Sequence, residues 1–148
     1  MKKRKPAYLA FRLGKEIFAA PAVKILEVLA PQPVTSIIGS KDMVKGVISF
    51  RGNIIPVLEI KHRFAMQVQP NQKEYVIIVF DISLNKKNVL IGAIADAVED
   101  VLPVEDADIQ PIPEKGLKFD AELVSGMIKR DDTFIKLINI DKVFQKEE

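Results

Sequence analysis

The sequence contains no cysteine and no tryptophan, and its only histidine is His62. The absence of cysteine excludes disulfides, thiol catalysis and cysteine-ligated zinc, and it fits a reducing compartment. His62 stands between Lys61 and Arg63 without a second histidine to complete a zinc site, which is typical of a surface residue. No apolar run reaches the ~18 residues of a membrane-spanning helix. These absences predict a cytoplasmic protein without a metal centre and without direct membrane insertion.

Motifs that support catalysis are also missing. The sequence has no glycine-rich phosphate loop and no nucleophile elbow. Carboxylates are plentiful, but none has the apolar surroundings that raise a carboxyl pKa for acid catalysis. The acidic run 105–108 lacks the glycine and the terminal glutamate of a calcium loop, and Asp131-Asp132 fits a turn. We therefore predict that the protein is not an enzyme and holds no cofactor.

The basic character of the chain is concentrated at its start. The net charge is +2, and residues 1–5 carry four basic side chains, so the rest is slightly acidic. We expect residues 1–5 to be a flexible basic tail that folding does not require. The remaining residues 6–145 are of a length that forms one domain.

Hairpin patterns recur along the chain. Four stretches alternate in Val, Ile and Phe around turn residues, as is typical of paired strands. They cover residues 8–20, 46–57, 75–95 and 126–140, and we place the turn of the second at Gly52-Asn53 because glycine accepts a positive φ. Residues 21–29 begin with proline and show helical spacing, which predicts one or two turns of helix.

The sequence repeats itself internally. A shift of 80 positions lays 46–64 over 126–144, and a shift of 73 lays 17–28 over 90–101. We infer two copies of one small β unit, roughly 8–74 and 75–144. A copy of this size would be only marginally stable on its own, so we expect the two copies to share a core and to form a groove between the lobes.

Nucleic-acid binding is the alternative function. Small β barrels bind single strands through exposed aromatic residues among basic ones. Here Phe11, Phe18 and Phe80 alternate inward, and the body of the chain is net negative. We therefore expect no nucleic acid among the partners, and keep a single-strand binder only as the runner-up.

The two copies differ most around the second hairpin. Arg51 and Pro56 align with Asp131 and Lys136 of the second copy. Taken alone, Pro56 would mark an edge strand or bulge, and Arg51 would be a solvated turn residue. Together they favour a fixed cation, because a guanidinium makes planar, bidentate contacts with carboxylates.

The stretch "GVISFRGNIIPVLEI" (46–60) resembles the signature of the CheW family of chemotaxis coupling proteins. Segments 25–28, 91–104 and 137–143 are similar to family segments, so the resemblance runs from Tyr8 to Phe144. It implies an all-β fold of two intertwined, SH3-like, five-stranded barrels with short helices. It also implies an adaptor that joins the regulatory domain of the histidine kinase CheA to the cytoplasmic tips of chemoreceptors.

The resemblance also implies site residues. Carried over by position, the candidates for receptor and kinase coupling are Ile25 and Glu27 in the expected short helix, Gly46, Arg51, Gly52 and Pro56. Val76 and Ile77 are weaker candidates, for which a core role is the stronger interpretation. We further expect Glu27 to hold Arg51 through an ion pair at the boundary between the lobes, where it positions a receptor-binding groove.

Overall fold

The computed structural model describes residues 6–41 and 43–145. The expected basic tail, residues 1–5, lies outside these residues. The chain has an N-terminal half, from β1 to η2, and a C-terminal half, from β6 to α1. The N-terminal half comprises β1 (Ala7–Leu13), β2 (Glu16–Pro21), η1 (Ala22–Lys24), β3 (Ile25–Leu29), β4 (Val44–Phe50), β5 (Asn53–Leu58) and η2 (Ile60–Phe64).

The C-terminal half repeats the order of five strands followed by a short helix, but its other 3-10 turns lie between the third and fourth strands. It comprises β6 (Val76–Leu84), β7 (Lys87–Ala95), β8 (Ala97–Pro103), η3 (Asp106–Asp108), η4 (Ala121–Leu123), β9 (Val124–Arg130), β10 (Thr133–Ile138) and the α-helix α1 (Ile140–Val143). All four expected hairpins form, because the turns between their strands are short and carry residues with positive φ.

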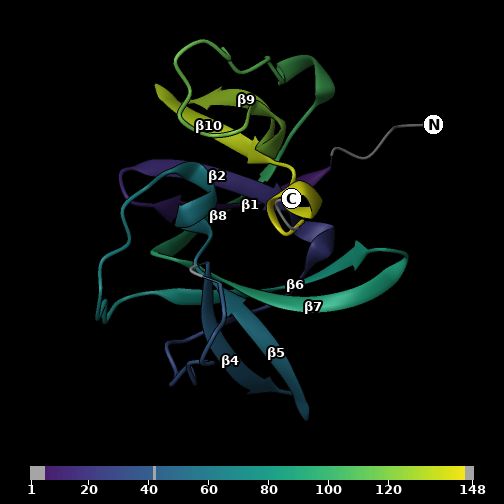
Figure 1. Cartoon of the computed structure of the whole chain (residues 1–148). Coiled ribbons are helices and arrows are strands. Elements are labelled where there is room, and N and C mark those ends of the chain that lie inside the picture. The colour runs from purple at the N-terminus through teal and green to yellow at the C-terminus, as the bar shows by residue number, and fades with distance from the viewer. Residues whose placement is uncertain (1–5, 42, 146–148) are drawn as a thin grey trace, which may run out of the picture.

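The strands form two five-stranded sheets, and each sheet takes strands from both halves. Sheet A has the order β8-β1-β2-β10-β9, and sheet B has the order β3-β6-β7-β5-β4. The chain therefore crosses from sheet A to sheet B between β2 and β3, and returns between β7 and β8. Figure 1 shows sheet A above and sheet B below. The predicted fold of two intertwined SH3-like barrels is confirmed, and we call them barrel A and barrel B.

Strand registers repeat between the barrels. In barrel B the parallel pair β5 and β7 aligns Val57 with Gly92, and in barrel A the parallel pair β10 and β2 aligns Leu137 with Ala19. These pairs are equivalent under the two sequence shifts. The antiparallel pairs β1–β8 and β3–β6 each contain a register irregularity. The agreement supports the internal repeat, although the division into copies 8–74 and 75–144 stays a prediction.

One hydrophobic core joins the barrels. Its largest cluster contains Phe11 and Phe18 from sheet A together with Phe80 from sheet B, and all three side chains are fully buried. Phe64 and Phe144 follow the fifth strand of each half; Phe64 packs against Phe18 in a tilted arrangement, and Phe144 packs edge-on against Phe80. Each barrel also has a smaller cluster of its own. The aromatic residues thus alternate inward as predicted, and neither barrel buries its core alone.

Two local predictions were only partly right. Only Ala22–Lys24 is helical within 21–29, and it is a 3-10 turn; Ile25–Leu29 is strand β3, paired with β6. Over five residues, alternation and helical spacing share several positions, which explains the error. The second hairpin turns at Arg51-Gly52, whereas Asn53 is already paired with Phe50.

Gly46 lies where a connecting segment crosses the edge strand β4. Thr35 and Val47 exchange backbone hydrogen bonds of 3.0 and 2.9 Å there. A Cβ atom on Gly46 would lie 2.2 Å from the carbonyl oxygen of Thr35, which is a backbone clash. Gly126 is enclosed in the same way in barrel A, next to Gln110. Both glycines are therefore needed for the close approach that covers the sheet edge.

We predict that Gly46→Ala lowers the free energy of unfolding by about 1–3 kcal/mol, the usual cost of forcing extra atoms into a packed site. Chemical denaturation measures this difference. Ser49→Ala, an exposed change on the same strand, is the control and should stay within about 0.5 kcal/mol of wild type. A Gly46→Ala protein as stable as the control would contradict the packing argument.

Candidate functional site

Arg51 occupies a turn position that suits arginine poorly. The two-residue turn at Arg51-Gly52 has φ values of 50° and 83°. The corresponding turns of the other long hairpins begin with Asn85 and Asp131, residue types that tolerate the left-handed region. A bulky residue held at positive φ carries backbone strain of order 1 kcal/mol. Turn chemistry therefore does not account for an arginine at this position.

Arg51 is held by Glu27, as predicted. The Arg51 Nη2 atom donates a hydrogen bond of 2.8 Å to Glu27 Oε1. The Arg51 guanidinium also lies 4.9 Å from the ring centre of Phe50. The Arg51 and Glu27 side chains are 60% and 41% exposed, so the pair contributes little to stability.

The location of this pair differs from the prediction. Glu27 and Ile25 lie on β3 rather than on a helix. The pair joins β3 to the β4–β5 turn, and β3 and β4 are the two edges of sheet B. Figure 1 shows the end of the β4–β5 hairpin pointing away from sheet A. The ion pair therefore closes barrel B between its edges and does not lie at the boundary between the lobes.

Pro56 explains an asymmetry between the barrels. The expectation of an edge strand was wrong, because β5 lies between β7 and β4. The parallel ladder to β7 includes only Val57 and Leu58, whereas the equivalent ladder in barrel A includes Ile135, Lys136 and Leu137. Lys136 takes the place of Pro56 there. Because proline has no backbone N–H, Pro56 cannot donate to a ladder, and the ladder to β7 begins only at Val57.

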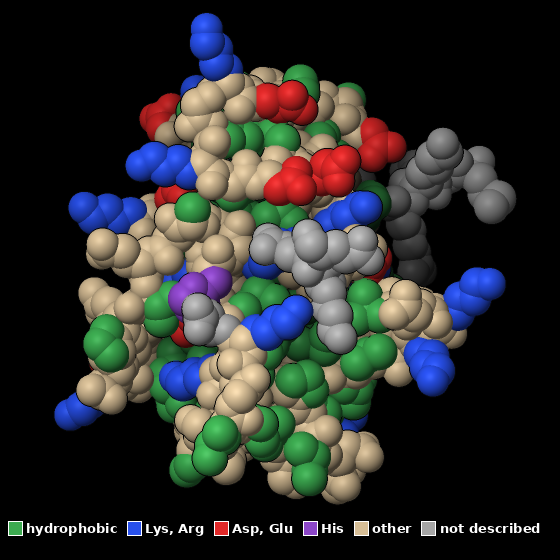
Figure 2. All heavy atoms as spheres, in the orientation of Figure 1, with side chains coloured by type: hydrophobic (Ala, Val, Ile, Leu, Met, Phe, Trp, Pro, Cys, Tyr) green, Lys and Arg blue, Asp and Glu red, His purple; other side chains and the backbone are tan. Residues whose placement is uncertain are grey.

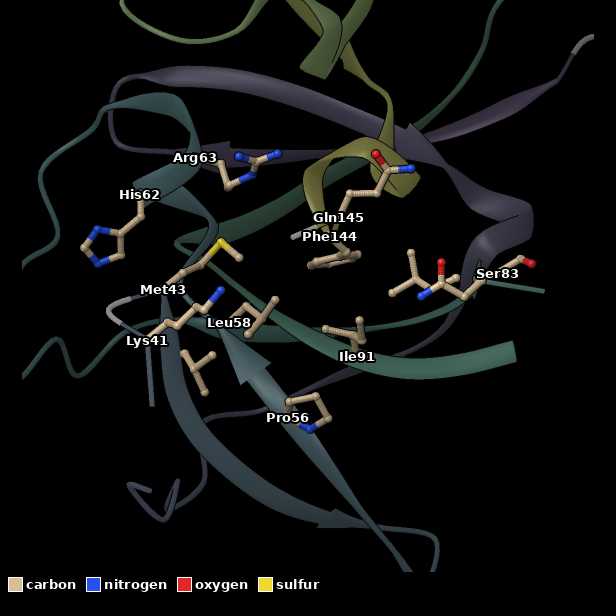
Figure 3. Close-up of a pocket in the computed structure, with 13 residues that line it drawn as sticks. Lys41, Met43, Pro56, Leu58, His62, Arg63, Ser83, Ile91, Phe144 and Gln145 are labelled. Atoms are coloured by element: carbon tan, nitrogen blue, oxygen red, sulfur yellow. The ribbon is translucent and has the colours of Figure 1, made fainter. Parts of the chain in front are cut away.

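A groove of about 900 Å³ lies beside Pro56, on barrel B. Figure 3 shows Phe144, which follows α1 of the C-terminal half, facing Leu58 and Ile91, while the Gln145 side chain points away from them. Its rim carries the cationic side chains of Lys41 and Arg63 and the exposed His62. Hydrophobic side chains gather on barrel B in the same view of the surface (Figure 2). The remaining lining residues are Met43, Val44, Pro56, Ser83, Leu84 and Asn85.

The predicted site residues fall into separate places. Pro56 lines the groove, while Arg51, Gly52 and Glu27 lie at the far end of the hairpin that carries it. Ile25 and Val76 are half-buried against the shared core, and Gly46 is enclosed beneath Thr35. Ile77 is fully buried, which confirms the core interpretation for that residue. The surface positions are therefore Arg51, Gly52, Glu27 and Pro56, all on barrel B.

A cluster around Asp96, which the sequence did not indicate, fixes the connection between the barrels. Asp96 follows β7, where the chain leaves barrel B. Its carboxylate accepts hydrogen bonds of 2.8 Å from Lys61 Nζ, 2.6 Å from Gln72 Nε2 and 2.6 Å from the backbone N–H of Gly14. Burial alone would raise the pKa of Asp96, but these hydrogen bonds outweigh it and lower the pKa. The feature of the sequence that could have pointed to this cluster is that Asp96 is an isolated aspartate between two apolar strand patterns.

Glu59 is a buried carboxyl group beside this cluster. Its side chain is 5% exposed, and Oε1 has no hydrogen-bond partner among the described residues. Burial raises the pKa of Glu59, while Lys61 and Lys45 oppose that rise. In the equivalent position of the C-terminal half, Asn139 caps α1 by accepting from Lys142 N–H. The Glu59 side chain does not cap its helix, so its negative charge destabilises the folded state.

The surface of the described residues has few of the features that bind nucleic acid or a metal ion. Phe134, which is 53% exposed, is the one aromatic residue among the strongly exposed large hydrophobic residues of the described chain. No group of three or more His, Asp or Glu side chains in 6–41 and 43–145 is arranged to hold a metal ion. Within those same residues, no helix has the length and apolar character to cross a membrane.

Comparison with known proteins identifies the family. The CheW-like domain family matches residues 7–148, nearly the whole chain. The chain therefore belongs to the CheW-like domain family.

Relatives and a solved structure agree over the same length. The chemotaxis protein CheW of Rhizobium meliloti is 31% identical over 140 residues, which span 95% of this chain and 88% of that protein. CheW of Klebsiella aerogenes is 30% identical over 141 residues, which span 95% and 82%. The crystal structure of the scaffolding protein TtCheW from Thermoanaerobacter tengcongensis has a TM-score of 0.83 at 27% identity, covering 99% of this chain and 92% of that one. The family that the sequence resembled is confirmed.

We predict that Glu59→Gln removes a pH-dependent loss of stability. A carboxyl group with a raised folded pKa stabilises the fold fully below its unfolded pKa, here near 4.5, and this contribution is lost as the pH rises through the folded pKa. Wild type should therefore lose about 1 kcal/mol relative to Glu59→Gln between pH 4.5 and pH 8, the order of an unpaired buried polar group. Denaturant titrations across this range measure it. The exposed control Glu114→Gln should follow wild type, and parallel curves for Glu59→Gln would refute the assignment.

Proposed function

We propose that this protein is a non-enzymatic chemotaxis adaptor that couples the regulatory domain of the kinase CheA to the cytoplasmic tips of chemoreceptors. The observation that carries the proposal is the match of nearly the whole chain, in sequence and fold, to chemotaxis and scaffolding CheW proteins. The absence of catalytic motifs from the sequence supports a binding role. In this proposal the protein is cytoplasmic and is recruited to receptor arrays by its partners.

The groove is the proposed receptor site. In the family resemblance the receptor tip is a helical hairpin, and an amphipathic helix binds a groove through an apolar stripe. Leu58, Ile91 and Phe144 offer an apolar floor for that stripe. Lys41 and Arg63 at the rim favour a partner with acidic side chains beside it. The kinase contact is assigned to the ends of the barrels, which pair with barrels of similar fold in the family.

The Arg51–Glu27 pair supports the groove from a distance. It fastens the tip of the β4–β5 hairpin to β3, and the opposite end of the same hairpin supplies Val44, Pro56 and Leu58 to the groove. Arg51 is therefore a positioning residue in this proposal. The strain at its positive φ is retained because the cation orients the hairpin. The adaptor transmits a receptor signal only through different affinities for two arrangements of its partners.

We predict that Arg51→Asn separates folding from coupling. Asparagine relieves strain at a positive φ, while the lost exposed ion pair costs about 0–1 kcal/mol, so stability should stay within about 1 kcal/mol of wild type. Assembly of a ternary complex with the receptor fragment and the CheA kinase of the same genome should fall, and binding of the kinase alone should persist. Thermal unfolding and co-sedimentation measure the two effects.

The matched control for this prediction is Lys129→Ala. It breaks the exposed Lys129–Asp132 pair at the equivalent hairpin of barrel A and should leave coupling intact. If Arg51→Asn folds and still couples the receptor, the positioning role is wrong. If it unfolds the protein, Arg51 is structural.

We predict that Ser83→Trp blocks the groove. Ser83 is exposed at the end of β6 and lines the groove, so a large side chain there should occupy it without disturbing the core. Receptor binding should fall about tenfold or more, since each 1.4 kcal/mol of lost contact changes affinity tenfold. Kinase binding should not change.

The control is Ser49→Trp, an equally exposed position on β4 outside the groove. Equal receptor affinity for both tryptophan variants would place the receptor elsewhere. Titration with a single-stranded oligonucleotide across salt concentrations, on the same samples, tests the nucleic-acid alternative.

A further inference from the structure

Two ion pairs fasten the points where the chain passes between the barrels. Lys61, in the short helix after β5, pairs with Asp96 at the β7–β8 crossing, with Nζ to Oδ1 at 2.8 Å. Asp141, in the short helix after β10, pairs with Lys24 at the β2–β3 crossing. Each pair thus joins a residue of the N-terminal half to one of the C-terminal half.

The two pairs occupy equivalent places with their charges reversed. The shift of 80 that aligns β5 with β10 places Lys61 on Asp141. The shift of 73 that aligns β2 with β7 places Asp96 on Val23, directly before Lys24. In the N-terminal half the pairing residues of the helix and of the crossing, Lys61 and Lys24, are therefore both cationic, and in the C-terminal half the pairing residues, Asp141 and Asp96, are both anionic.

This arrangement of charges favours the pairing of an N-terminal half with a C-terminal half (unlike halves) over the pairing of two N-terminal or two C-terminal halves (like halves). The strand registers of the halves are equivalent, so the backbone alone would also allow β5 of one chain to pair with β2 of another. Such a pairing of two N-terminal halves would bring Lys61 towards Lys24. A pairing of two C-terminal halves would bring Asp141 towards Asp96. Both contacts join like charges, whereas the observed fold joins only opposite charges.

Burial makes this difference significant. The Lys61 and Asp96 side chains are 5% and 19% exposed, and those of Lys24 and Asp141 are 33% and 36% exposed. Charges removed from water in this way are costly unless they are paired. Arg63 adds a further contact between the halves, because it donates to the backbone carbonyl groups of Val143 and Lys142 in α1. The residue equivalent to Arg63 is Val143, which has no side-chain donor.

We propose that the charge-reversed pairs Lys61–Asp96 and Lys24–Asp141 select the partner of each half, so that unlike halves pair and exchange of strands with a like half of a second chain is disfavoured. The partner that the two crossings reject is a second copy of this chain. This inference concerns assembly of the fold and does not depend on the proposed function.

The test is a variant that exchanges the charges of the two helices. Lys61→Glu with Asp141→Lys places like charges in both native contacts and opposite charges in both like-half contacts. We expect a lower melting temperature and a monomer–dimer equilibrium shifted towards dimer by about tenfold or more, which corresponds to about 1.4 kcal/mol, because the exchange disfavours both native contacts and favours both like-half contacts. Light scattering after size-exclusion chromatography, over a range of protein concentrations, measures the mass.

The matched control reverses the crossings as well. Adding Lys24→Glu and Asp96→Lys to the exchanged variant restores opposite charges in both native contacts. The proposal expects this fourfold variant to recover the wild-type mass and part of the melting temperature, because Asp96→Lys also removes the acceptor for Gln72 and for the backbone N–H of Gly14. It is overturned if the twofold variant behaves as wild type, or if the fourfold variant is as disturbed as the twofold one. In the second case shape and burial, rather than charge, would explain the loss.

Strand exchange itself can be detected because the chain has no cysteine. Ala19 and Val57 lie in different sheets, paired with Leu137 and Gly92 respectively. Pairing of two N-terminal halves would place Ala19 of one chain beside Val57 of the other. With Ala19→Cys and Val57→Cys added, oxidation should join two chains in the twofold variant and not in the fourfold variant. A dimer without this crosslink would show association by another surface and would contradict like-half pairing.

Discussion

The structure depends on two short parallel pairings, β5 with β7 and β10 with β2. Each adds the β4–β5 or β9–β10 hairpin of one half to the β6–β7 or β1–β2 hairpin of the other. Without them each half would be left with separate hairpins whose apolar faces are open to water, and isolated hairpins are marginal at best. The shared core around Phe11, Phe18 and Phe80 follows from this exchange, because strands that alternate between barrels bring their inward faces to one place.

The same scaffold becomes a binding surface through differences between its halves. A proline in β5 shortens the ladder that Lys136 continues in β10, and the groove lies at that point. An arginine replaces the usual residue of a tight turn, and a carboxylate on the opposite sheet edge receives it. Stability explains neither residue, since one interrupts a ladder and the other is held at a positive φ. Both lie on the β4–β5 hairpin, so the proposed function of barrel B has no counterpart in barrel A.

Local features of the fold could be read from the sequence, and long-range ones only in part. The hairpins were predictable because turn residues such as Asp131 and Gly52 act on their immediate neighbours. The choice of parallel partner depends on residues far apart in the chain, so the strand order of each barrel was not derivable from spacing. The Arg51–Glu27 pair was found through the family resemblance, but its place within one barrel was not. Asp96 and Lys61 were missed because each is an ordinary charged residue until the crossings bring them together.

Because of the two crossings, the strands of barrel B are all synthesised before the strands of barrel A are complete. Barrel B contains β3 to β7 and has all its strands once Ala95 has left the ribosome, whereas barrel A needs β10, which ends at Ile138. The hairpin β1–β2 therefore waits for β8, β9 and β10, which are made after every strand of barrel B. Throughout that interval Phe11 and Phe18 lack part of the core that later encloses them, including Leu123, Ile138 and Val143, and unpaired apolar strands are prone to aggregate. Because the barrels are intertwined, β1 and β2 are therefore exposed for a long time to the chaperones and proteases that bind unfinished chains.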